Sequence, residues 1–234
     1  MMRIKRSEQR GSADYGWLRA NYSFSFAQYY SSEDVHFGAL RVLNDDIVEG
    51  GMGFGMHPHD NMEIITIPLQ GRLRHKDSMG FEDIISPGEI QIMSAGRGLM
   101  HSEHNPDPNE SVNLLQIWMF PNQKNVDPRY HKSSYQLEKN KLKILVGPGP
   151  QEGLPWIYQS SYFSLLELEA GKEFVYDMQL KSHGLYAFVI EGELLTGDEM
   201  LHKRDAVMLT QQQDLQIKAV ADSKILWIES PLQW

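Results

Sequence analysis

Five of the nine histidines lie between residues 57 and 104, and two of the segments that hold them repeat one spacing. His57 and His59 are separated by one residue, as are His101 and Glu103. Residues i and i+2 of a strand point to the same face. If the two segments are neighbouring strands facing one cavity, they present three neutral ring nitrogens and one carboxylate oxygen to one point. That donor set suits a divalent iron, nickel, copper, manganese or zinc ion with positions left open for a substrate.

The other histidines of this stretch, His75 and His104, are interpreted as ordinary structural or surface groups. His104 stands three residues after His101, so a regular strand would point the two side chains to opposite faces. Asn44, Asp45 and Asp46 follow an apolar run and are interpreted as a turn rather than as a paired-carboxylate site.

The elements that must position these side chains are predicted to be strands. Short apolar or alternating runs, each bounded by Gly, Pro, Asn, Asp or Ser, recur with almost no helical periodicity, which indicates an all-β barrel or sandwich. In the first half these runs are 62–69, 72–75, 81–85, 89–93, 99–103 and 112–120. The polar segment 121–141 is interpreted as a connector, and a second strand-rich region follows it.

The amino-acid composition excludes several classes of functional site. The chain has 234 residues and no cysteine, which excludes disulfides, a thiolate nucleophile, zinc fingers and cysteine-held iron–sulfur clusters. Lys and Arg number 22 against 31 Asp and Glu, so a net charge of −9 argues against direct nucleic-acid binding. No apolar run is long enough to span a membrane, and no apolar stretch follows the charged N-terminus, so we expect a cytoplasmic protein without a membrane partner.

Glycines around the histidines add a second pattern. Gly51, His57, His59, Glu63 and Gly71 form G-x5-H-x-H-x3-E-x7-G, and G-x2-H-x3-N follows at residues 98–105. With one extra residue in the first motif, and a glycine where the second usually has a proline, these spacings resemble the two motifs of the cupin superfamily. Taken alone, the cupin spacing nominates Glu63 as the carboxylate ligand.

A more specific resemblance covers the N-terminal half of the chain. Six segments are similar to the pirin family: 13–18 (ADYGWL), 23–27 (SFSFA), 54–59 (FGMHPH), 75–80 (HKDSMG), 91–96 (QIMSAG) and 116–118 (QIW). The resemblance implies a bicupin, in which two double-stranded β-helix (jelly-roll) barrels lie face to face and only the N-terminal barrel holds a metal. It divides the chain into a metal-binding domain, 1–130, and a second barrel, 131–234. Met178 and Leu180 stand there at the positions of His57 and His59.

The same resemblance implies a ligand set and an activity. The ion would be held by His57, His59, His101 and Glu103. Iron is the metal expected first, and nickel, copper, manganese, zinc and cobalt are the alternatives. Bacterial pirins similar to this chain act as quercetin 2,3-dioxygenases, so we expect a metal-dependent dioxygenase that takes a flavonol-like aromatic or phenolic substrate and O2. Glu103 would also be the catalytic proton acceptor, and Glu63 would support a ligand imidazole.

Further expectations concern the pocket and the alternatives. Phe24, Phe54 and Met56 are predicted as wall residues, and Tyr22 stands where many relatives have a histidine, so substrate preference would differ if that position meets the pocket. The alternative function is a non-enzymatic, metal- or redox-dependent regulator that binds a protein partner, either a transcription factor or a metabolic enzyme. A cupin with another small substrate is a third hypothesis.

Overall fold

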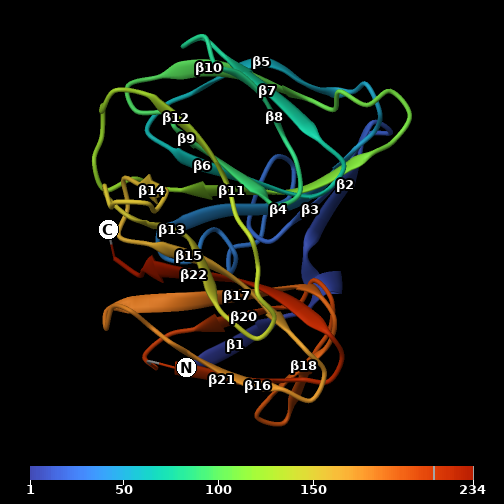
Figure 1. Cartoon of the computed structure of the whole chain (residues 1–234), viewed down its shortest axis with the longest axis vertical. Helices are drawn as coiled ribbons and strands as arrows, with labels where there is room; N and C mark the ends of the chain where they lie inside the picture. The colour runs from blue at the N-terminus through green and yellow to red at the C-terminus, as the bar shows by residue number, and fades with distance from the viewer. Residues whose placement is uncertain (213, 234) are drawn as a thin grey trace.

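The computed structural model describes residues 1–212 and 214–233, and strands dominate it (Figure 1). Gln213 and Trp234, the latter the end of the predicted second domain, lie outside the described residues. A short 3-10 helix, η1 (Ser7–Gln9), follows the first strand. The predicted all-β class is confirmed.

The first barrel is built from two sheets. Its four-stranded sheet has the order β5 (Gly53–His59), β10 (Leu99–His104), β7 (Leu73–Asp77) and β8 (Glu82–Ile85). Its seven-stranded sheet has the order β12 (Arg129–Ser134), β9 (Glu89–Ser94), β6 (Glu63–Gln70), β11 (Val112–Met119), β4 (Leu40–Val48), β3 (Leu18–Tyr22) and β2 (Gly11–Asp14).

The second barrel repeats this arrangement. Its seven-stranded sheet has the order β1 (Met2–Lys5), β20 (Ala206–Leu209), β17 (His183–Glu191), β22 (Ser223–Pro231), β15 (Tyr162–Leu168), β13 (Lys143–Pro148) and β14 (Trp156–Ile157). Its smaller sheet has the order β16 (Glu173–Asp177), β21 (Asp214–Ala219), β18 (Leu194–Thr196) and β19 (Glu199–Leu201).

The two large sheets pack against each other, so the molecule has four sheet layers along its long axis (Figure 1). The largest apolar cluster lies between them and joins Leu43, Ile65 and Ile117 of the first barrel to Phe163 and Tyr186 of the second. Strands of a sheet covered on both faces are apolar at nearly every position, as in 64–67 (IITI). The opposite face of each large sheet is left to line the interior of its own barrel.

The two barrel interiors differ in character. The second is filled with apolar side chains, among them Leu166, Val189, Ile217 and Trp227. The first contains smaller apolar clusters and, between them, buried polar and ionisable groups such as His101 and Glu103. The cavity described below therefore belongs to the first barrel alone.

Two strands depart from the simple division of the chain into halves. β1 pairs with β20, from Met2 opposite Leu209 to Lys5 opposite Ala206, so the N-terminus lies in the second barrel. β12 pairs with β9 of the first barrel and occupies part of the segment interpreted as a connector. That interpretation was wrong for these residues, because a polar strand at the edge of a sheet lacks the apolar pattern of a buried one.

The interpretation of Asn44, Asp45 and Asp46 as a turn was also wrong. All three lie inside β4, paired with both β3 and β11. Their side chains alternate between the barrel interior and the interface between barrels, and on the interface side Asp45 finds partners in Arg204 and Asn113.

Candidate metal centre

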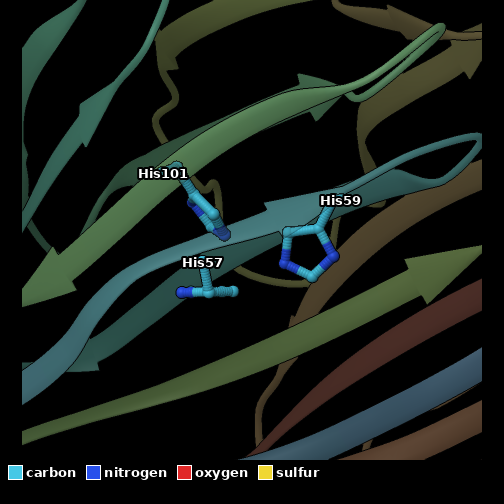
Figure 2. A group of neighbouring side chains, drawn as sticks. All are labelled: His57, His59 and His101. Atoms are coloured by element: carbon cyan, nitrogen blue, oxygen red, sulfur yellow. The ribbon is translucent and has the colours of Figure 1, made fainter.

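The predicted ligand histidines come from two neighbouring strands. β5 and β10 run antiparallel with His57 directly opposite His101. His57, His59 and His101 point toward one another, with ring centroids 4.4 Å apart for His57 and His101 and 4.9 Å for the other two pairs (Figure 2). One nitrogen from each ring lies within 4.8 Å of the others. The i, i+2 spacing thus places both histidines of β5 on the inner face, as predicted.

His101 has the chemistry expected of a metal ligand. Its side chain is 1% exposed, and neither ring nitrogen has a hydrogen-bond partner among the described residues. Leaving buried polar atoms unpaired costs about 1–3 kcal/mol, and a bound cation would remove that cost. Burial lowers the pKa of His101 well below its usual value and that of His59 to about 4. Both rings are therefore neutral near pH 7, as metal ligation requires.

Hydrogen bonds to neighbouring groups orient the side chains of His57 and Glu103. Nδ1 of His57 lies 2.8 Å from the carbonyl oxygen of Gly55, which fits a tautomer with Nε2 free to bind a cation. The Glu103 carboxylate accepts a hydrogen bond from Nε2 of Gln116 at 2.9 Å and one from Oγ1 of Thr66 at 3.4 Å. Burial raises the pKa of Glu103 to about 7, although both hydrogen bonds act to lower it.

His75 lies closer to this site than its interpretation as an ordinary structural group suggested. One ring nitrogen of His75, one of His101 and a carboxylate oxygen of Glu103 lie within 4.8 Å of one another. Nε2 of His75 is 3.1 Å from Oδ2 of Asp77, and its ring stacks on Tyr130. His101 therefore stands between two groups of potential ligands, and Glu103 belongs to the group with His75. His104 is exposed on the outer face of β10, as its parity predicted.

Glu63 does not face these histidines. Its Oε2 accepts a hydrogen bond from Ser94 at 2.7 Å, and the two residues are paired across β6 and β9. The neighbouring Ile64 packs on the opposite face of β6, with Trp118. The expectation that Glu63 supports a ligand imidazole was wrong, because strand alternation turns its carboxylate away from the site.

A cavity of about 440 Å³ opens beside the histidines, a size suited to a small organic ligand. Five aromatic residues line it: Trp17, Tyr22, Phe26, Phe54 and Trp118. The prediction that Phe54 is a wall residue is correct, and position 22, for which contact with the pocket was left open, lines it as well. The predictions for Phe24 and Met56 were wrong, since Phe24 packs between the barrels and Met56 points outward at 49% exposure.

A polar row across the large sheet was missed by sequence reasoning. Tyr22, Asn44, Gln116 and Thr66 are neighbours in register on β3, β4, β11 and β6. All are buried, and two of them, Gln116 and Thr66, donate hydrogen bonds to the carboxylate of Glu103. The signal was present in the sequence as single polar residues inside apolar runs, as in 114–118 (LLQIW).

Asp46 stands one pleat from this row and also lines the cavity. Burial, together with the nearby charges of Asp45 and Glu103, raises the pKa of Asp46 to about 8. Asp45 points the other way, between the barrels, where its Oδ2 accepts a hydrogen bond from Nε of Arg204 at 2.7 Å. The two adjacent carboxyl groups therefore face different environments, Asp46 the cavity and Asp45 the interface between the barrels.

The second barrel also contains a buried carboxylate, and its hydrogen-bond donors come from the protein itself. Glu229 is fully buried and accepts hydrogen bonds at 2.8 Å from the backbone N–H groups of both Gln179 and Leu180. Tyr176 also donates to this carboxylate, at 3.3 Å. Among the residues that the structure describes, both groups of potential metal ligands lie in the first barrel.

Comparison with known proteins gives the family. The family model described as Pirin matches residues 3–119, and the one described as Quercetinase C-terminal cupin domain matches residues 144–230. The chain belongs to the pirin family.

Some relatives of this pirin match over nearly its full length, and another matches over half of it. Quercetin 2,3-dioxygenase of Escherichia coli (strain K12) is 34% identical over 231 residues, which cover 99% of each chain. The crystal structure of the bacterial pirin YhhW from Escherichia coli in complex with nickel(II) superimposes with a TM-score of 0.93 and 33% identity, covering 99% of each chain. Pirin-like protein of Caulobacter vibrioides is 44% identical over 121 residues, or 52% of each chain.

These matches confirm the predicted resemblance and the bicupin fold. With the histidine cluster and the nickel complex of a relative, they support a metal-binding cupin that takes a divalent ion. Full-length similarity to a quercetin 2,3-dioxygenase supports assigning this pirin to the metal-dependent dioxygenases. None of the described helical segments has the length and apolar character needed to cross a membrane.

Proposed function

We propose that this pirin is a quercetin 2,3-dioxygenase-type enzyme that opens flavonol-like phenolics with O2. The observation that carries the proposal is the cluster of His57, His59 and His101 at the wall of an aromatic-lined cavity of about 440 Å³. Glu103 completes the proposed ligand set for one divalent transition metal ion. Iron is the metal we expect first, and nickel, copper, manganese, zinc and cobalt are the others to test.

The residues around Glu103 suit it to proton transfer. A flavonol offers a hydroxyl beside a ketone, and a divalent ion acts as a Lewis acid that lowers the pKa of such a hydroxyl. Gln116 fixes Oε2 of Glu103 at 2.9 Å, whereas the contact of Oε1 with Thr66 is longer, at 3.4 Å. We therefore assign proton acceptance to Oε1, which is the less firmly held oxygen.

The aromatic walls suit a flat substrate and exclude water from it. Trp17 meets Phe54 edge to face at 5.2 Å, and Trp118 meets the ring of His59 in the same way at 4.9 Å. Both pairs border the cavity, so a planar ring system would pack against rigid aromatic surfaces. Positioning of this kind lowers the entropic cost of reaching the reactive geometry.

Organisation and location complete the proposal. We propose a metal-binding domain at 1–130 and a second barrel at 131–234. Two strands cross this division, because β1 pairs within the second barrel and β12 within the first. We also propose a cytoplasmic protein without a nucleic-acid partner, in keeping with its net charge of −9. Neither the structure nor the comparisons favour the alternative of a regulator with a protein partner.

The test is aerobic turnover of quercetin by protein loaded in turn with each of the six metals. We expect loss of flavonol absorbance, O2 uptake and release of carbon monoxide with at least one metal. His101→Ala should abolish all three, whereas His104→Ala, on the outer face of the same strand, should retain them. Absence of turnover with every metal would contradict the proposed activity.

A further inference from the structure

The cavity contains one carboxyl group that the proposed ligand set does not use. Asp46 is 4% exposed and lines the cavity, and its Oδ1 has no hydrogen-bond partner among the described residues. It comes from β4 of the seven-stranded sheet, whereas the three histidines come from β5 and β10 of the facing sheet. A substrate held at the histidines would therefore meet Asp46 at a different part of its framework.

The neighbouring carboxyl group shows what a purely structural aspartate looks like in this strand. Asp45 accepts hydrogen bonds from both Arg204 and Asn113, at 2.7 and 2.8 Å. The Oδ1 atom of Asp46 accepts no hydrogen bond from the described residues. The same is true of Oδ1 of Asn44, which lies two residues earlier on the same face of β4. Buried polar atoms of this kind normally find a partner, and here both residues border the space that a ligand would fill.

A hydroxyl group is the ligand feature that fits Asp46. It can donate to a carboxylate or accept from a protonated carboxyl, so it satisfies Asp46 in either state. Much of the remaining wall is aromatic, and of the two unpartnered oxygens that border the cavity the carboxyl of Asp46 forms stronger hydrogen bonds than the amide of Asn44 when it is ionised. We propose that Asp46 is a specificity-determining residue that hydrogen-bonds a substrate hydroxyl other than the one beside the ketone, so that the site selects polyhydroxylated phenolics.

This inference rests on the proposed function for its ligand class, and it is tested by binding rather than by turnover. The probes are quercetin and 3-hydroxyflavone, which share the hydroxyl beside the ketone and differ because 3-hydroxyflavone lacks the other hydroxyls. Affinities are measured by isothermal titration calorimetry of the nickel-loaded protein in the absence of O2. We expect the wild-type protein to bind quercetin about tenfold more tightly, the size of effect that one hydrogen bond to a buried group gives.

Three variants separate the role of Asp46 from a general effect on the fold. Asp46→Leu should lose the preference by weakening quercetin alone, and Asp46→Asn, which keeps a donor and an acceptor, should retain most of it. Asp45→Asn makes the same change on the opposite face of β4 and should keep the full preference. Bound nickel, measured in each variant, shows whether the metal centre is intact.

Each outcome has a distinct meaning. A preference that survives in Asp46→Leu, or that is absent from the wild-type protein, would overturn the inference. Failure of both probes to bind would overturn both the inference and the proposed function. Selective binding without aerobic turnover would leave the inference standing and refute the proposed activity.

Discussion

Nε2 of Gln116 donates a hydrogen bond to Oε2 of Glu103 at 2.9 Å and so links the two sheets of the first barrel. Gln116 belongs to β11 of the large sheet and Glu103 to β10 of the small one. The carboxylate proposed as a ligand is therefore oriented by a residue of the opposite wall. Removing that donor should release the carboxylate without disturbing the histidines.

Gln116→Leu should lower metal affinity about ten- to a hundredfold, the usual effect of losing a group that orients a ligand. Thr66→Val should have a smaller effect, because its contact with Glu103 is longer, at 3.4 Å. Competition with a chelator measures both. Gln159→Leu is the matched control, since that buried amide donates to the carbonyl oxygen of Phe120, away from the proposed ligands. Equal losses in Gln116→Leu and Gln159→Leu would point to a general effect on folding.

His75→Phe should retain about one metal ion per chain, whereas His57→Ala should bind almost none. Phenylalanine can keep the stacking on Tyr130 but removes the contact with Asp77, so we expect a cost of about 1–3 kcal/mol in unfolding free energy. Metal analysis of the purified variants and urea unfolding give the two measurements. The reverse pattern of metal content would assign the ion to His75, His101 and Glu103 instead.

Asp34→Asn should reduce the free energy of unfolding by about 3 kcal/mol at neutral pH, because it leaves the buried amine of Lys5 without its charged partner. Burial acts to raise the pKa of Asp34, but the hydrogen bond and charge of Lys5, with the charge of Arg3, lower it overall. The stabilisation is therefore complete above the unfolded-state pKa of about 4 and is lost as pH falls through the lower folded-state value.

Urea unfolding between neutral pH and about pH 3 checks this dependence. The difference between wild-type protein and Asp34→Asn should be constant above about pH 5 and shrink in more acidic solution. Glu33→Gln, an exposed neighbour, should follow the wild-type curve throughout. A gap that stays constant down to the lowest pH would rule out titration of Asp34 as its source.

Arg204→Ala should destabilise the protein by about 3 kcal/mol, because Asp45 is 6% exposed and would keep only one charged partner, the more distant Arg10 at 3.9 Å, beside its hydrogen bond from Asn113. The double variant Asp45→Asn/Arg204→Ala should recover part of the loss, since the buried carboxylate is removed together with the guanidinium that neutralised it. Lys203→Ala is the control, as its ion pair with Glu191 is exposed and should contribute almost nothing. Additive losses in the double variant would show that the pair is not coupled.

The sequence was sufficient to predict the strand class and the histidine positions, because both depend on local alternation. His57 and His59 on one strand, and His101 on another, share a face for the same reason that apolar residues do. The predicted proximity of Glu103 to His101 follows from that rule as well.

What could not be predicted depends on partners far along the chain. Asn44 to Asp46 looked like a turn because three polar residues in a row rarely form a central strand, yet Asp45 is matched by Arg204 and Asn113. Glu63 was expected beside a ligand imidazole and Phe24 in the cavity wall, although both side chains point elsewhere. Which face of a strand meets which barrel is set by the packing of two large sheets, and no local pattern contains that information.

Pairing of β1 with β20 also sets the order in which the chain can fold. Residues 2–5 leave the ribosome long before their partners, residues 206–209, have been synthesised. The first barrel can begin to form during translation, whereas its N-terminal extension has to wait for the second sheet. Completion of the native structure is thus a late, long-range event, and loop-closure entropy should slow it relative to a chain whose first strand pairs locally.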